Sequence, residues 1–244
     1  MRLAILADIH GNLLALEAVL ADVATRHVDL TVNLGDLVSG PLQPRETADL
    51  LMSLNLPTIC GNHERNLLSQ PLESMGASDR FARQFLHSAH LEWLASLPET
   101  LKLDEDILLC HGTPASDTDY LLESIDEQGF RLATDTEVTA RITSTSASLI
   151  LCGHSHLPRL ANLSAGQTIV NPGSVGVQAY HAEWPHPHTV STGSPHARYA
   201  IADQQGQTWS IEFLEVAYDW DSAAQLAASN RRPDWVTPLL TGNV

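Results

Sequence analysis

The chain has 244 residues, of which 43% are hydrophobic, so it is long enough to bury the core of a single domain spanning residues 1–244. Its formal net charge of −16 at pH 7 argues against duplex DNA or RNA as a partner, because phosphate backbones are bound by clustered Lys and Arg. No apolar run approaches the ~20 residues of a membrane-spanning helix, and the first predicted strand begins at Arg2 without room for a signal peptide, so we expect a cytoplasmic protein with no membrane partner.

Units of a strand, a tight turn and a helix recur in the first part of the chain. The apolar run from Arg2 to Ala7 predicts a strand that ends at Asp8, and residues Leu13 to Thr25 have helical periodicity. A second strand from Leu30 to Leu34 ends at a Gly-Asp pair, and residues Thr47 to Leu54 predict the next helix. Because strands that alternate with helices pair in parallel, we expect functional side chains at the carboxyl ends of these strands.

The pattern changes in the second half of the chain. Residues Ser78 to Ser96 predict a helical segment, and a short apolar strand from Ser148 to Cys152 follows later. Beyond it, short strands joined by turn residues resemble a second, antiparallel sheet. These strands are Arg159 to Leu163, Thr168 to Asn171, Arg198 to Ala202 and Thr208 to Glu215. The sequence therefore predicts an α/β fold, a two-sheet β-sandwich flanked by helices.

The segment from Tyr180 to His196 has an unusual composition. Four histidines alternate with prolines and a glycine over these 17 residues, which predicts a long irregular loop at 180–196. Two interpretations remain open: the loop is a solvent-exposed insertion, or it is a lid that contacts the substrate.

Polar side chains follow the ends of several predicted strands. Asp8 and His10 lie two residues apart, as do His154 and His156, and this spacing lets both members of a pair face one side of a strand. Asp36 follows the second strand, and its two oxygens suit a bridge between two cations. Each motif alone is more typical of an ordinary turn, but their joint occurrence predicts a two-metal hydrolytic site. The candidate metal ligands are Asp8, His10, Asp36, Asn62, His111, His154 and His156.

The two residues that follow Asn62 are the catalytic candidates. His63 is predicted to protonate the leaving-group oxygen, and Glu64 to orient its imidazole and favour its charged form. The alternative is that His63 is a capping or surface histidine, in which case Glu64 needs no particular partner.

The order of these motifs resembles that of the calcineurin-like metallophosphoesterase superfamily. The series Asp-x-His, Gly-Asp, Gly-Asn-His-Asp/Glu, His and Gly-His-x-His extends from Asp8 to His156, and residues Asn171 to Val175 resemble a segment of the small bacterial phosphoesterase branch. The resemblance implies His63 as the general acid, oriented by Glu64. It further implies that Asp8, His10 and His156 bind one metal, that Asn62, His111 and His154 bind the other, and that Asp36 bridges them.

The resemblance also implies a reaction. It implies two divalent metal ions and favours Mn²⁺. Mixed nitrogen and oxygen ligation is also compatible with Fe²⁺, Co²⁺, Ni²⁺ or Zn²⁺. The two metals would generate a bridging hydroxide that hydrolyses a phosphodiester or phosphomonoester. We expect a small phosphate-ester substrate, a class that includes nucleotides. The alternatives are a protein phosphatase, a dinucleoside polyphosphate hydrolase, or a noncatalytic scaffold of the same fold, and the presence of His63 argues against the scaffold.

The chain departs from the small bacterial branch in one segment. An Arg or Lys often follows the Asn-Pro-Gly-Ser-Val segment of that branch, whereas Gln178, Ala179 and Tyr180 stand here. Arg65 and Arg159 flank the motifs and suit either phosphate binding or an exposed, solubilising role. We therefore do not carry the substrate preference of the branch over to this chain.

Overall fold

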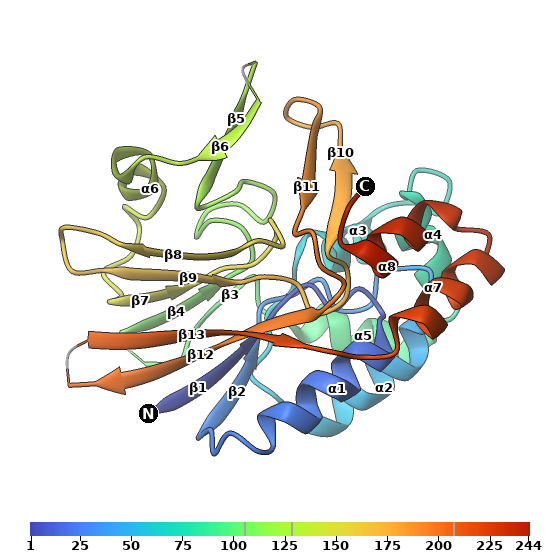
Figure 1. The fold of residues 1–244 in the computed structure, drawn as a ribbon, viewed down its shortest axis with the longest axis horizontal. Coiled ribbons are helices and arrows are strands. Elements are labelled where there is room, and N and C mark those ends of the chain that lie inside the picture. Colours follow the sequence, from blue (N-terminus) through green and yellow to red (C-terminus); the bar gives the residue numbers. More distant parts are fainter. Residues whose placement is uncertain (105, 128, 207) are drawn as a thin grey trace.

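The computed structural model describes residues 1–104, 106–127, 129–206 and 208–244. Two β-sheets pack face to face, with helices on their outer faces (Figure 1). The first sheet has the strand order β13-β12-β1-β2 and consists of β13 (Thr208–Val216), β12 (Ala197–Gln205), β1 (Arg2–Leu6) and β2 (Leu30–Asn33). The second has the order β3-β4-β7-β9-β8 and consists of β3 (Thr100–Lys102), β4 (Ile107–Cys110), β7 (Leu149–Leu151), β9 (Thr168–Pro172) and β8 (Pro158–Asn162). The predicted fold class is confirmed.

The strands that carry the functional residues pair in parallel, as predicted. β1 is parallel to β2, and β7 is parallel to both β4 and β9. The prediction that the four later strands form a sheet of their own is wrong. β8 and β9 extend the sheet of β4 and β7, whereas β12 and β13 extend the sheet of β1, in which Ile5 lies opposite both Val32 and Ala200.

Strand β1 is apolar from Leu3 to Leu6 because both of its faces are covered there. Leu3 and Ile5 point into the core between the sheets, where they join Leu109 of β4. Ala4 and Leu6 point to the opposite face and join the core beneath the helices. Alternating side-chain directions therefore explain why the run is continuous rather than alternating between apolar and polar residues.

Helices cover the outer faces of both sheets. The first sheet is covered by α1 (Leu13–Val23), α2 (Pro44–Leu54), α3 (Asn62–Ser69), α4 (Ala77–Arg83) and α5 (Ser88–Ser96), and the second by α6 (Asp135–Arg141). The helical segment predicted at 78–96 is thus two helices with a break at residues 84–87. Helix α1 is capped by the Asn12 side chain, which accepts a hydrogen bond from the backbone N–H of Ala15.

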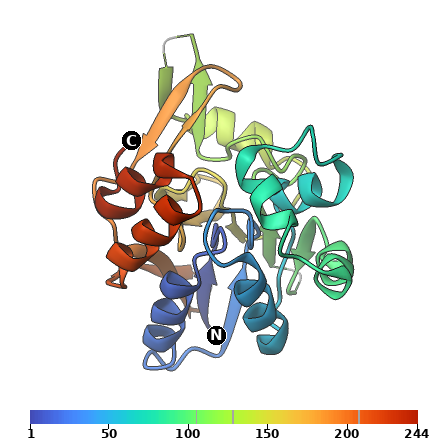
Figure 2. The ribbon, with the colours of Figure 1, turned by 90° about the vertical axis from the view of Figure 1, so that its right-hand side faces the viewer.

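The segment predicted as an irregular loop at 180–196 contains a β-hairpin. Strand β10 (Ala179–Ala182) pairs antiparallel with β11 (His188–Ser191), next to a second hairpin of β5 (Glu123–Asp126) and β6 (Gly129–Leu132). Figures 1 and 2 show both hairpins projecting from the same end of the molecule. Residues 188–191 alternate between buried and exposed positions, which is a strand pattern, but four residues are too short a stretch to stand out among prolines and histidines.

The chain ends in helices that lie beside the β10–β11 hairpin (Figure 2). They are α7 (Trp220–Ser229), the 3₁₀ turn η1 (Pro233–Trp235) and α8 (Val236–Thr241). Alanines of α7 and Leu239 of α8 pack around Leu42, which lies in the long loop after β2. The C-terminal helices thereby reach the end of the sheet where the functional side chains gather. Among the helices of the four described ranges, none is long and apolar enough to cross a membrane.

Candidate functional site

The structure brings all seven predicted metal ligands together at one end of the two sheets. They follow β1, β2, β4 and β7, except for Asn62, which begins α3. Two clusters have ligand atoms within 4.8 Å of one another, the first made of Asp8, His10 and His156 and the second of Asp36, His111 and His154. The first cluster has the same members as one of the groups that the resemblance implies, whereas the second contains Asp36 in place of Asn62.

The first cluster places two imidazole lone pairs against each other. Nδ1 of His10 lies 2.8 Å from the carbonyl oxygen of Ser39, and Nδ1 of His156 lies 2.9 Å from that of Val177. Because a carbonyl can only accept, each Nδ1 carries the proton and each Nε2 presents a lone pair. The two Nε2 atoms lie only 3.1 Å apart, and Oδ1 of Asp8 is 3.5 Å from that of His156.

This first cluster fits a divalent cation. Burial lowers the pKa of His10 to about 4 and holds the pKa of His156 well below its usual range, so both rings are neutral at pH 7. Burial also raises the pKa of Asp8 to about 8. A divalent cation placed between the two imidazole lone pairs and Asp8 would relieve the repulsion between the lone pairs and stabilise the ionised carboxylate. A cation with mixed nitrogen and oxygen ligation satisfies all three.

The histidines of the second cluster are also oriented by backbone carbonyl groups. Nδ1 of His111 lies 2.7 Å from the carbonyl oxygen of Leu34, which turns its Nε2 toward Oδ1 of Asn62 at 3.2 Å. In His154 the assignment is reversed, because its Nε2 lies 3.0 Å from the carbonyl oxygen of Thr118. His154 would therefore bind a metal through Nδ1, unlike His10, His111 and His156.

Asp36 belongs to the second cluster but lies on the side that faces the first, between His111 and His10. Its Oδ2 is 3.1 Å from Nε2 of His111 and 3.9 Å from Nε2 of His10. Burial alone would raise the pKa of Asp36, but the charges of His111 and His63 hold it well below its usual range. An ionised carboxylate at this place is suited to bridge two cations.

Most of the predicted ligands lie on strained backbone. Five of the seven have a positive φ, between 52° and 68°, and they are Asp8, His10, Asp36, His154 and His156. For residues other than glycine this left-handed conformation costs on the order of 1–2 kcal/mol each. The surrounding loops leave no room for relaxation: a Cβ on Gly35 would lie 2.5 Å from the backbone nitrogen of Gly61, and one on Gly61 only 2.3 Å from Oδ1 of Asp36. The glycines of these motifs are therefore required by close backbone approach.

His63 has a partner that the sequence did not indicate. Its Nδ1 lies 2.6 Å from Oδ1 of Asp79, a buried residue of α4 that also accepts a hydrogen bond from the Ser39 hydroxyl. Burial opposes the charged imidazole, but the charges of Asp36 and Asp79 raise the pKa of His63 to about 9. The His63 ring lies 5.3 Å from the His10 ring. Because Nδ1 of His63 faces Asp79, its protonated Nε2 remains available as a proton donor beside the clusters.

The expected contact between Glu64 and His63 is corrected by the structure. The fully buried carboxylate of Glu64 accepts hydrogen bonds from the backbone N–H groups of Asp36 at 2.8 Å, Leu37 at 2.9 Å and Gly61 at 2.9 Å. Glu64 therefore ties the loop after β2 to the start of α3, and so positions Asp36 rather than orienting the His63 ring.

The two arginines singled out by sequence have carboxylate partners. Nε of Arg65 lies 2.6 Å from Oδ2 of Asp117, and Nε of Arg159 lies 3.5 Å from Oε1 of Glu123. Neither arginine lines the cavity beside the two clusters.

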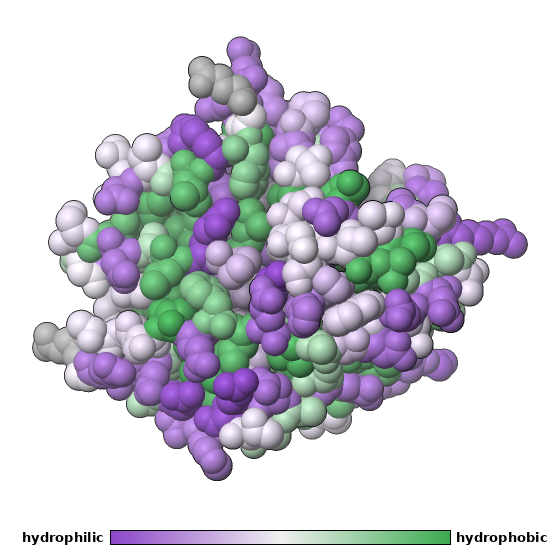
Figure 3. Space-filling model, viewed as in Figure 1, coloured by the Kyte–Doolittle hydropathy of each residue, from purple (hydrophilic) through white to green (hydrophobic). Residues whose placement is uncertain are grey.

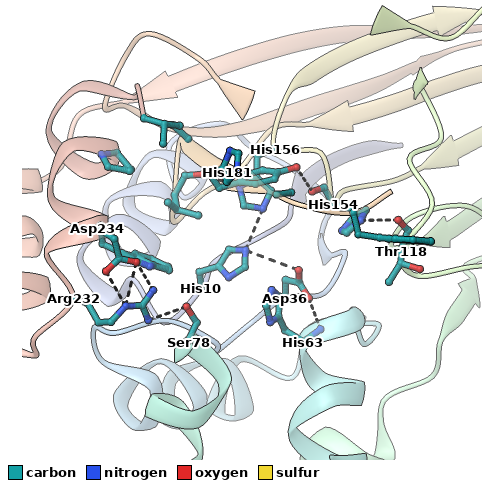
Figure 4. A pocket seen from close by; sticks show the side chains of 18 of the residues that line it. His10, Asp36, His63, Ser78, Thr118, His154, His156, His181, Arg232 and Asp234 are labelled. Atoms are coloured by element: carbon teal, nitrogen blue, oxygen red, sulfur yellow. Dashed lines mark hydrogen bonds and ion pairs between the residues drawn. The ribbon is translucent and has the colours of Figure 1, made fainter. Parts of the chain in front are cut away.

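That cavity has a volume of about 500 Å³ and opens next to the first cluster. Figure 4 shows His10 and Asp36 near its centre, with Thr118 on one side and Arg232 and Asp234 on the other. Its walls come from the β10–β11 hairpin and from the C-terminal segment. The hairpin lies in the segment for which a substrate-contacting lid was one of the two open interpretations, whereas no prediction was made for the C-terminal segment.

Two tyrosines connect the hairpin to the ligands. The ring of Tyr120 stacks on His154 with 4.8 Å between centroids, and the ring of Tyr180 lies edge-on to His156 at 4.8 Å. Their hydroxyl oxygens are 2.7 Å apart, and the Tyr120 hydroxyl also lies 3.0 Å from Nε2 of His188 on β11. Tyr180 is one of the residues found where the small bacterial branch often has a cation, so the departure in sequence lies directly beside the ligands.

Comparisons with known proteins agree with this geometry. Residues 1–192 match the calcineurin-like phosphoesterase superfamily domain. An uncharacterized protein of Methanocaldococcus jannaschii is 27% identical over 96% of this chain and 95% of its own length. A metallophosphoesterase from Sphaerobacter thermophilus, also 27% identical, superposes with a TM-score of 0.75 over 98% of both chains. The chain therefore belongs to the calcineurin-like phosphoesterase superfamily and is a metal-dependent phosphoesterase.

Proposed function

We propose that the chain is a binuclear phosphoric ester hydrolase that acts on small phosphodiesters or phosphomonoesters. The observation that carries this proposal is the position of Asp36 between two ligand clusters, within 3.9 Å of His10 on one side and 3.1 Å of His111 on the other. In this proposal one metal is held by Asp8, His10 and His156, the other by Asn62, His111 and His154, and Asp36 binds both. Mn²⁺ is the favoured metal, and the donor set also suits Fe²⁺, Co²⁺, Ni²⁺ and Zn²⁺.

The residues of the chain then have distinct tasks. When bound, two divalent cations supply Lewis-acid polarisation of the phosphoryl group and activate water for attack. His63 donates the proton from Nε2 to the departing oxygen, so that a neutral alcohol leaves. Asp79 holds the His63 ring through Nδ1 and favours its protonated form, while Glu64 holds the loop of Asp36 in place.

A small ester suits the site better than the alternative substrates. A cavity of about 500 Å³ falls within the ~300–1,000 Å³ range of small-molecule sites. The side chain of Arg232, the arginine of the cavity, is bound to Asp234, which leaves it less suited to a chain of phosphates or a phosphoprotein. A protein phosphatase or dinucleoside polyphosphate hydrolase therefore ranks second.

The test is hydrolysis by metal-reconstituted protein. Protein stripped with a chelator and reloaded with Mn²⁺, Co²⁺, Ni²⁺ or Zn²⁺ is assayed with bis-p-nitrophenyl phosphate and p-nitrophenyl phosphate, and metal content is measured in parallel. We expect turnover that rises with the second equivalent of metal. Turnover that is already complete at one equivalent contradicts the binuclear centre, and no turnover with any of the four metals contradicts the enzymatic function.

A further inference from the structure

The wall of the cavity farthest from the second cluster is formed by a segment outside the family match. Residues 193–244 lie beyond the 1–192 that match the superfamily domain, and Trp235, Pro238 and Val244 from this part line the cavity. Figure 3 shows hydrophobic residues gathered over the C-terminal helices, on the right of this face. From the hairpin side, Val177 and Ala179 contribute further apolar surface. An apolar wall thus borders a centre of buried carboxylates and histidines.

Trp235 is the largest side chain of this wall, and it is held close to the first cluster. Its ring centroid lies 6.2 Å from that of His10, with 72° between the ring planes. The indole packs against the core around Leu42, and its Cη2 would lie 3.1 Å from a Cβ on Gly40. The ring remains partly exposed toward the cavity. It is therefore a fixed aromatic surface rather than a mobile side chain.

The charge beside Trp235 is already compensated. The guanidinium of Arg232 lies 5.8 Å from the indole centroid, in a cation–π arrangement. It donates to Oδ2 of Asp234 at 2.6 Å and to the hydroxyl of Ser78 at 3.1 Å. Among the described residues that line the cavity, Arg232 is the single arginine and there is no lysine. This wall therefore suits a planar organic group better than additional phosphates.

We propose that the wall formed by Trp235 and the hairpin binds a planar aromatic group of the substrate, a nucleobase in a nucleoside phosphate, while its phosphate lies on the two ligand clusters. This proposal rests on the proposed function for the position of the phosphate. The Trp235 ring centroid lies 6.2 Å from that of His10, a span that the ribose of a nucleoside 5′-phosphate can bridge. Stacking on an indole tolerates different bases, because every base has a flat π face.

Binding measurements test the proposal without relying on turnover. The affinities of inorganic phosphate and of a non-hydrolysable phosphonate analogue of adenosine 5′-monophosphate for Mn²⁺-loaded protein are measured by titration calorimetry. We expect the nucleotide analogue to bind on the order of ten-fold more tightly than phosphate. Trp235→Ala should remove most of this advantage and leave phosphate affinity within about two-fold, and Trp235→Phe should restore part of it.

Trp209→Ala is the matched control. Trp209 lies on β13, packs against the core between the sheets and is remote from the cavity, so its loss should not change the ratio of the two affinities. Equal affinities for nucleotide analogue and phosphate in the unsubstituted protein would overturn the proposal. An unchanged ratio of the two affinities in Trp235→Ala would overturn it as well. Trp235→Phe keeps an aromatic ring at this position, so a partial recovery of the ratio shows that the loss in Trp235→Ala comes from the missing ring and not from a disturbed fold.

Turnover separates this proposal from the proposed function. Methyl p-nitrophenyl phosphate and thymidine 5′-p-nitrophenyl phosphate share a leaving group and differ in the group that would meet Trp235. We expect Trp235→Ala to raise KM for the thymidine ester by about ten-fold and to change the methyl ester little. If neither ester is hydrolysed but the difference in binding persists, the hydrolase function fails and the aromatic site stands. If both esters are hydrolysed with the same kcat/KM in each variant, the aromatic site fails and the hydrolase function stands.

Discussion

The loops that carry the proposed ligands and the walls of the cavity are built in contrasting ways. The ligand loops are buried, adopt left-handed backbone at five of the seven ligands, and approach so closely that Gly61 has no room for a Cβ. The walls consist of a projecting hairpin, whose Trp184 is 79% exposed, and of a C-terminal segment beyond the family match. Strain and close packing fix the first region, whereas the second combines an exposed hairpin tip with a Trp235 ring that is packed on the core and partly open to the cavity.

This contrast predicts which residues can be substituted without loss of metal binding and turnover. A ligand loop that shifts by one ångström misplaces a metal ligand, so its backbone has to be held by tertiary contacts such as those of Glu64. Wall residues such as Trp235 and Tyr180 line the cavity and contact the proposed ligands through their rings, but neither is itself a proposed ligand. We therefore expect substitutions in the ligand loops to change metal content and turnover, and substitutions in the walls to change affinity.

The largest effect is expected for Asp36→Asn. The amide removes the charge between the two clusters and can no longer bind two cations at once, so metal affinity should fall by more than about 100-fold and turnover should be lost. Metal content per chain, measured after dialysis, checks this expectation. A variant that retains two metals with full affinity would show that Asp36 is not the bridge.

The next effect separates proton donation from metal binding. His63→Ala should lower kcat by roughly 10²–10⁴-fold while leaving the metal content intact, because His63 is proposed as an acid and not as a ligand. Asp79→Asn should lower kcat less, and it should move the alkaline fall in activity to lower pH, since the Asp79 charge raises the pKa of His63. The pH profile of kcat for Asp79→Asn measures the expected shift. Loss of metal in His63→Ala would instead show that His63 is a metal ligand.

The candidate ligands could be selected from the sequence because their signal is local. Each ligand motif follows an apolar strand or a tight turn, so strand ends and polar residues can be recognised together. The partner of His63 had no such signal, because Asp79 lies 16 residues away in a helix of ordinary composition. The role of Glu64 depends on amides 27 and 28 residues earlier, which only the folded chain brings near.

Long-range pairing explains the remaining errors of the sequence interpretation. β12 joins β1 through pairs such as Arg2 with Asp203, and nothing in either short segment selects this partner over β8 or β9. The β10–β11 hairpin was hidden because its strands have four residues each and are separated by prolines. The hairpin side of the cavity depends on the pairing of these two short strands, so its shape could not be predicted from the local pattern.

Glu123 is a buried residue at the start of β5. Its shifted pKa leads us to expect that the stability of the protein depends on pH. Burial raises its pKa to about 7, against the opposing effects of the Ser155 hydroxyl and the Arg159 charge. Because the folded state binds this proton more tightly than the unfolded state, the free energy of unfolding should fall as pH rises from about 4.5 to about 7. Glu123→Gln should remove that dependence, which amounts to about 3 kcal/mol at most.

Urea unfolding of both proteins between pH 4.5 and 8 measures this difference. Asp203→Asn serves as the control, because Asp203 pairs with Arg2 at the far end of β12 and is partly exposed. Parallel pH profiles for the unsubstituted protein and Glu123→Gln would contradict the assignment of the dependence to Glu123.

The smallest effect is expected for Tyr180→Phe, on the hairpin side of the cavity. The variant loses the hydrogen bond between the Tyr180 and Tyr120 hydroxyls but keeps the ring beside His156, so KM should change by about two- to ten-fold, with metal content unchanged. Tyr199→Phe is the matched control, since it removes a hydroxyl bound to Asp22 far from the cavity. If Tyr180→Phe lost metal, or lowered kcat as much as His63→Ala, the hairpin would belong to the metal centre. The contrast between the ligand loops and the walls of the cavity would then not hold at Tyr180.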